Sequence, residues 1–124
     1  MGSFVAILIG GTMGCWARYL LTSLLQSLFG RGFPVATLTI NVFGSFLMGL
    51  LFILTLERIV ISPDLRTGIL TGFLGGFTTF STYAMEMLLL AERGEALKSV
   101  LYAGLSVSLG LAAAFTGAQL ARAL

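Results

Sequence analysis

The sequence contains no histidine and only one cysteine, Cys15. A disulfide within the chain is therefore impossible, and a zinc site is nearly excluded, because structural zinc is held mainly by Cys and His side chains. Ser-His-Asp and Cys-His catalytic sets both require a histidine. We therefore expect that the protein is not an enzyme.

Charged residues are also scarce. They make up 10% of the 124 residues, whereas 57% are hydrophobic, and a soluble domain has about 25% charged residues. A small globule has too little interior to bury so much apolar surface, so we expect an all-α integral membrane protein with one domain over residues 1–124. The net charge is only +2 and the basic residues are scattered, which argues against a nucleic-acid partner.

Four segments are long and apolar enough to cross a bilayer, which takes about 20 residues. The sequence predicts spans at Phe4–Leu28, Pro34–Leu56, Leu65–Leu90 and Ala96–Leu120. The segments between them, FGRGF, ERIVISPD and AERGE, carry Gly, Pro and most of the charge, as loops do. With four spans, both termini lie on one side of the membrane.

The positive charges are balanced between the two sides. Arg58, Arg66 and Arg122 fall on the side of the termini, and Arg31, Arg93 and Lys98 on the other. The Lys and Arg bias that orients most membrane proteins is thus absent. This favours insertion in both orientations and an antiparallel, dual-topology homodimer, a closed pair of the commonest type. The alternative is a single orientation set by weak cues.

Small residues recur four apart and predict close helix contacts, either within one chain or between chains. These pairs are Gly10 and Gly14, Gly68 and Gly72, Gly72 and Gly76, and Ala113 and Gly117.

Several polar residues fall at membrane depth. Asn41 lies in the second span, where its amide either links helices or donates to an anion in a pore. Ser106 belongs to a stripe of small and polar residues in the fourth span, which is either a helix seam or one wall of a polar track. Arg18 lies about 21 Å into the first span, and Glu86 lies near the far end of the third. Each of these two either reaches the interface or sets the charge of a pore mouth, and Arg18 could instead pair with a carboxylate.

The third span is predicted to break at its middle. Gly75-Gly76 and Thr78-Thr79 weaken a helix, and unwound backbone in a membrane is tolerated only where protein or a cavity covers it. In an antiparallel dimer, carbonyls freed in both chains could surround one cation; the alternative is a simple kink.

No Asp or Glu falls at the centre of any span, and hydrogen-bond donors without acids suit an anion. Phe77, Phe80 and Tyr83 recur every three residues and present either ring edges, which are weakly positive, or an apolar stripe.

Three segments, GGTMGCWARY, TLTINVFGSFLMG and TGFLGGFTTFSTYAME, resemble the CrcB/Fluc fluoride channels. The resemblance covers nearly the whole chain and is loosest in the fourth span. It implies an antiparallel homodimer in the cell inner (plasma) membrane, with two pores that export fluoride passively. It also implies roles for single residues: ring positions Phe80 and Tyr83, the Asn41 amide, hydroxyls of Ser81, Thr82 and Ser106, backbone carbonyls of Gly75 and Thr78 around a central structural sodium, and vestibule residues Arg18 and Glu86.

Two positions depart from the family pattern. Tyr83 stands where Phe is usual, so its hydroxyl either donates to the anion or binds a neighbour and turns the ring. Gly110 stands where some members have another hydroxyl. A small dual-topology multidrug-type exporter shares the four spans but needs a carboxylate in the first span, which this chain lacks. A structural or assembly subunit would use the same polar residues for packing only.

Overall fold

The structure is a computed structural model that describes all residues from Met1 to Leu124, and it consists entirely of helices and short connections. In chain order the elements are α1 (Gly2–Phe29), α2 (Val35–Ile53), η1 (Leu54–Arg58), α3 (Pro63–Thr67), η2 (Gly68–Leu74), α4 (Gly75–Phe77), α5 (Phe80–Glu92) and α6 (Ala96–Ala123). The segments η1 and η2 are π-helical continuations of the α-helices that precede them.

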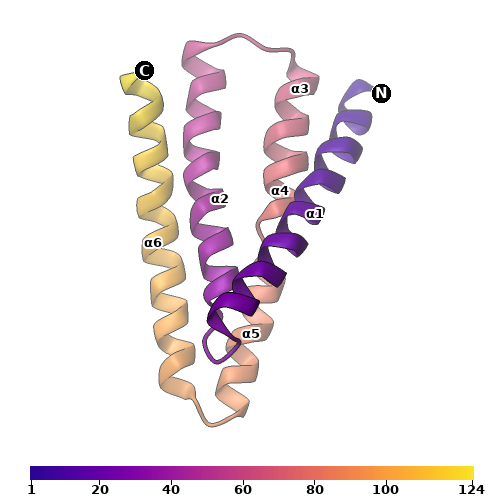
Figure 1. Ribbon diagram of the computed structural model, residues 1–124. Helices are drawn as coiled ribbons and strands as arrows, with labels where there is room; N and C mark the ends of the chain where they lie inside the picture. The colour runs from indigo at the N-terminus through magenta and orange to yellow at the C-terminus, as the bar shows by residue number, and fades with distance from the viewer.

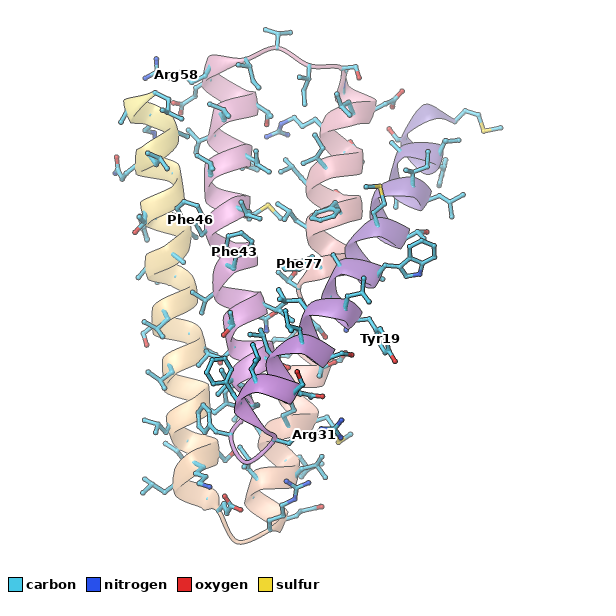
Figure 2. The ribbon with its side chains drawn as sticks, viewed as in Figure 1. Tyr19, Arg31, Phe43, Phe46, Arg58 and Phe77 are labelled. Carbon is cyan, nitrogen blue, oxygen red and sulfur yellow. The ribbon has the colours of Figure 1, made fainter.

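The elements form four long, roughly antiparallel helical columns (Figure 1): α1, α2 with η1, the segments from α3 to α5, and α6. The two termini and the α2–α3 connection lie at one end, and the other two connections lie at the opposite end (Figure 1). Helices α2 and α6 lie side by side, while α1 is tilted and crosses the column formed by α3 to α5 (Figure 1). Arg58 marks the end that holds the termini, and Arg31 marks the opposite end (Figure 2).

Helix boundaries follow from local sequence. Ser62 caps α3 by accepting a hydrogen bond from the Leu65 N–H at 3.2 Å, and Pro63 occupies the first helical position, where no donor is lost. Helices α1 and α5 end close to Gly30 and Gly94, which have φ of 74° and 78°. That left-handed backbone is strongly disfavoured for other residues, so these two glycines allow the chain to reverse.

Three helical stretches are long and apolar enough to cross a membrane: Gly2–Phe29, Val35–Arg58 and Ala96–Ala123. They confirm three of the predicted spans and identify a multi-pass membrane protein. The segment predicted as the third span is divided among α3, η2, α4 and α5. Only 16 of the 124 residues are buried in the single chain, so most of its apolar surface faces outward.

Glycines form two close seams within the chain. On α1, a Cβ at Gly10 or Gly14 would overlap the carbonyl oxygens of Gly68 and Phe73. Between α2 and α6, a Cβ at Gly49 or Gly117 would similarly overlap backbone oxygens of the facing helix. The glycines predicted to bring helices together thus do so inside one chain.

Candidate functional site

The backbone between α4 and α5 is extended at Thr78 and Thr79. We call these two residues and the helix ends beside them the interruption. Thr78 has φ −84° and ψ 159°, and Thr79 has φ −151° and ψ 122°. The C-terminal end of α4 and the N-terminal end of α5 therefore face each other across two non-helical residues. Helix ends carry carbonyl and amide groups with no helical partner, and in an apolar surrounding those groups need other partners.

Asn41 supplies partners to Thr79 in both directions. The Thr79 N–H donates to Asn41 Oδ1 at 2.8 Å, and Asn41 Nδ2 donates to the Thr79 carbonyl at 2.9 Å. In an unbroken helix the Thr79 N–H would donate to the Gly75 carbonyl. Asn41 is therefore a link between α2 and the interruption, which is the first of the two roles predicted for it. Its second amide hydrogen remains for another acceptor.

Hydroxyl groups organise the start of α5. Thr79 Oγ1 caps the helix by accepting from the Thr82 N–H at 3.3 Å, and it donates to Thr82 Oγ1 at 3.0 Å. The Thr82 N–H is the donor that an unbroken helix would give to the Thr78 carbonyl. Thr78 Oγ1 donates to the Leu74 carbonyl at 2.9 Å. As a result, the Gly75 and Thr78 carbonyls both lose their helical donors.

Arg18 contacts the interruption from the other side. Its Nε donates to the Gly76 carbonyl at 3.0 Å. The guanidinium lies at the C-terminal end of α4, where a positive charge is favourable next to exposed carbonyls. Side chains from α1 and α2 thus bond to successive parts of the same non-helical segment.

Two pockets adjoin the interruption and share Thr79. The first, with a volume of about 310 Å³, is a lateral groove lined by Asn41, Gly44, Ser45, Met48, Thr78, Thr79, Phe80 and Ala114. The second, of about 270 Å³, lies between α1, α2 and α5 and is lined by Cys15, Arg18, Tyr19, Thr22, Gln26, Thr37, Ile40, Thr79, Thr82 and Glu86. The structure therefore brings Arg18 and Glu86 to one pocket, and Asn41 and Phe80 to the other. The lateral groove contains amide and hydroxyl groups and no carboxylate.

Four rings follow one another from the groove toward the α1–α2 connection. The centroids of Phe80 and Tyr83 are 5.5 Å apart, those of Tyr83 and Tyr102 are 5.0 Å apart, and those of Tyr102 and Phe33 are 5.7 Å apart. The last two pairs meet edge to face, at 68° and 76°. The Tyr83 hydroxyl is 3.5 Å from the Ala103 carbonyl, too long for a strong hydrogen bond.

Phe77 does not join this series, despite its spacing from Phe80. It is buried at 5% exposure and packs against Phe43 and Phe73, with ring centroids 6.3 and 6.0 Å away. Figure 2 shows Phe77 beside the interruption and Phe43 on α2. The regular spacing fails because the extended residues Thr78 and Thr79 lie between the first ring and the second.

The remaining predicted residues have different surroundings. Glu86 accepts a hydrogen bond from the fully buried Tyr102 hydroxyl at 2.9 Å. Ser106 Oγ is buried without a hydrogen-bond partner, and Ser81 is exposed. Tyr102 was missed as a site residue. A tyrosine within an apolar helix requires a partner for its hydroxyl, and that requirement could have signalled a buried polar partner without identifying it.

The fold and these polar groups define a helical membrane protein with hydrogen-bond donors arranged around an interrupted backbone. The chain belongs to the CrcB family, because the family described as "CrcB-like protein, Camphor Resistance (CrcB)" matches residues 5–118. A protein of Acidithiobacillus ferrooxidans is 58% identical over 116 residues, covering 94% of this chain and 93% of that protein. One from Geobacter metallireducens is 44% identical over 124 residues and covers both chains completely. Both relatives are named fluoride-specific ion channel FluC.

The substitution Asn41→Ala tests the link to Thr79. It removes both partners of the Thr79 backbone, so the free energy of unfolding in detergent should fall by about 2 to 4 kcal/mol, given about 1 to 3 kcal/mol for each buried group left unpaired. Thr39→Ala on the exposed side of α2 is the control, with an expected change within about 0.5 kcal/mol. Equal losses in the two variants would contradict the assigned role of Asn41.

Proposed function

We propose that this protein is a fluoride-selective passive ion channel and not an enzyme. The observation that carries the proposal is the sequence identity of this chain, over nearly its full length, to proteins named fluoride-specific ion channels. The matched region includes the interrupted segment and the helices that contact it, because the family match spans residues 5–118. The proposed working location is the cell inner membrane.

The chemistry of the lateral groove supports an anion as the solute. Asn41 keeps one amide hydrogen free, Ser45 adds a hydroxyl, and Phe80 lines the same groove. Ring edges are weakly positive, so they can face a small anion without a fixed cation. Ser106 Oγ, buried and unpaired, is a further donor that lacks an acceptor in the single chain. In this proposal these groups, with Tyr83, Ser81 and Thr82, form the fluoride path.

A second copy of the chain would complete the path. The groove opens sideways rather than into a closed bundle, and Phe80 is 78% exposed. The balanced charge of the two ends supports pairing in an antiparallel sense, since neither orientation is favoured on insertion. The interrupted column from α3 to α5 would serve as a fourth span, broken at its middle. Two chains related by a two-fold axis would then have two equivalent pores.

The freed carbonyls fit a structural sodium ion at the centre of such a dimer. No group of three or more His, Cys, Asp or Glu side chains clusters in this chain, so a metal ion would have to be held by other oxygens. Gly75 and Thr78 are the two residues whose carbonyls lose helical donors to Asn41 and Thr79. Oxygen ligands suit a hard cation. Each of the two chains would supply one pair of carbonyls, from Gly75 and Thr78. Bound there, the ion would offset the partial negative charge of these carbonyls.

Passive transport would protect the cell without an energy source. Hydrogen fluoride crosses a membrane as a neutral weak acid and ionises in the less acidic interior. A membrane potential that is negative inside then drives the anion outward through an open pore. Neither competing function gains support. A multidrug-type exporter would need a carboxylate in α1, and this helix contains none. A purely structural subunit would give no role to the Ser106 hydroxyl, which is buried without a partner.

Ion efflux from liposomes tests the proposed function directly. Vesicles that contain the purified protein should release fluoride rapidly down its gradient, while identically prepared vesicles loaded with chloride should retain their anion. Protein-free vesicles provide the background rate. The proposal is wrong if fluoride leaves the protein-containing vesicles no faster than it leaves the empty ones.

Replacing an exposed ring tests whether ring edges carry the anion. Phe80→Ile keeps an apolar side chain and removes the positive edge, so fluoride efflux should fall by about tenfold, which corresponds to about 1.4 kcal/mol in the barrier. Phe115→Ile is the matched control, because Phe115 is exposed on α6 and does not line the groove. Unchanged efflux in Phe80→Ile would remove the ring from the path.

A further inference from the structure

An arginine inside a membrane span is costly and needs a reason to be there. Arg18 has no carboxylate partner, since the ion pairs of the chain are Lys98–Glu95 and Arg122–Glu57. Glu86 lines the same pocket as Arg18, but its Oε1 accepts from the Tyr102 hydroxyl. The hydrogen-bond partner of the Arg18 guanidinium is the Gly76 carbonyl, at 3.0 Å.

The sequence on both sides makes this contact possible. Gly11, Cys15 and Arg18 are spaced by four and three residues, so they share one face of α1. A Cβ at Gly76 would lie 2.8 Å from the Gly11 carbonyl oxygen and 3.3 Å from the Cys15 nitrogen. Only glycine at position 76 therefore lets α4 approach this face closely, and Arg18, one turn further along, then reaches its carbonyl.

We propose that Arg18 is a positioning residue that holds the end of α4 through its Nε–H. Gly76 lies between Gly75 and Thr78, whose carbonyls have lost their helical donors, so the bond from Arg18 fixes the direction in which the peptide groups of this segment point. Together with Asn41, it holds the interruption from two sides. The expected effect on fluoride efflux rests on the proposed channel function. The hydrogen bond from Arg18 to Gly76 does not depend on that function.

The competing role is a charge that attracts anions into the pocket that Arg18 shares with Glu86. Two substitutions separate the roles. In glutamine, Nε2 is as many bonds from Cα as Nε is in arginine, so Arg18→Gln keeps a donor at that position and removes the charge. In lysine, a methylene occupies that position, so Arg18→Lys keeps the charge and displaces the donor. Arg18→Met removes both.

The experiment measures the maximum fluoride efflux rate, the half-saturating fluoride concentration and the thermal unfolding temperature for the four proteins. If Arg18 positions α4, the efflux maximum falls about tenfold in Lys and Met variants, whereas the Gln variant keeps about half or more. The half-saturating concentration stays constant, because the local anion concentration does not depend on the bond. The unfolding temperature follows the same order, with Gln close to the original protein.

The opposite order would overturn the proposal. If Lys retains full efflux and Gln requires more fluoride for half-saturation, in a way that salt abolishes, then Arg18 acts through its charge. Unfolding temperatures distinguish this failure from failure of the channel function. With no efflux from any of the four proteins, a Gln variant more stable than the Lys variant would still support the positioning bond, and equal stability would refute it.

Discussion

The reciprocal hydrogen bonds between Asn41 and Thr79 are the interaction on which the rest of this structure depends. They let the backbone leave the helix at Thr78 and Thr79 within an apolar part of the chain. Without them, a donor and an acceptor would be left unpaired in a part-buried, apolar setting, where a fully buried unpaired group costs about 1 to 3 kcal/mol. Once the Thr79 N–H is bound to Asn41, the Gly75 carbonyl has no helical donor. One side chain on α2 thus both permits the interruption and leaves the Gly75 carbonyl without its helical donor.

Helix α1 also supplies a partner to the non-helical segment, from the side opposite α2. At Gly10, Gly14 and Gly76, a Cβ would overlap the facing backbone and keep α1 away from the segments from α3 to α5. This close approach brings the Arg18 Nε to the Gly76 carbonyl. The α1 seam therefore belongs to the folding of one chain. The lateral groove beside Asn41 and Phe80, in contrast, opens to the outside of the chain.

Much of the fold could be predicted from the sequence, because membrane spans are encoded by long apolar segments and loops by Gly, Pro and charge. The extended residues also fall where paired glycines and threonines weaken the helix. The predicted spacing of Phe77, Phe80 and Tyr83 misled, because a helical repeat does not continue through two extended residues. Two other features depend on how α5 and α6 pack: the bond from Tyr102 to Glu86 and the ring contact between Tyr83 and Tyr102. No local pattern encodes contacts between residues so far apart in sequence.

Tyr83 is held by its ring more firmly than by its hydroxyl. Its hydroxyl is 3.5 Å from the Ala103 carbonyl, and its ring contacts Phe80 and Tyr102 on either side. The ring thus keeps its place in the series, while the hydroxyl is held only weakly and can turn to another acceptor. Tyrosine at this position therefore supplies a ring to the series and a hydroxyl donor beside it.

Amide hydrogen exchange at Thr79, measured by NMR in detergent micelles, tests the central interaction most directly. Thr79 lies outside any helix, yet its N–H should exchange far more slowly than that of the loop residue Gly32, because it is bonded to Asn41. In the Asn41→Ala variant, Thr79 exchange should rise to the loop rate while the amides in the middle of α2 stay protected. Fast exchange at Thr79 in the original protein would contradict the account.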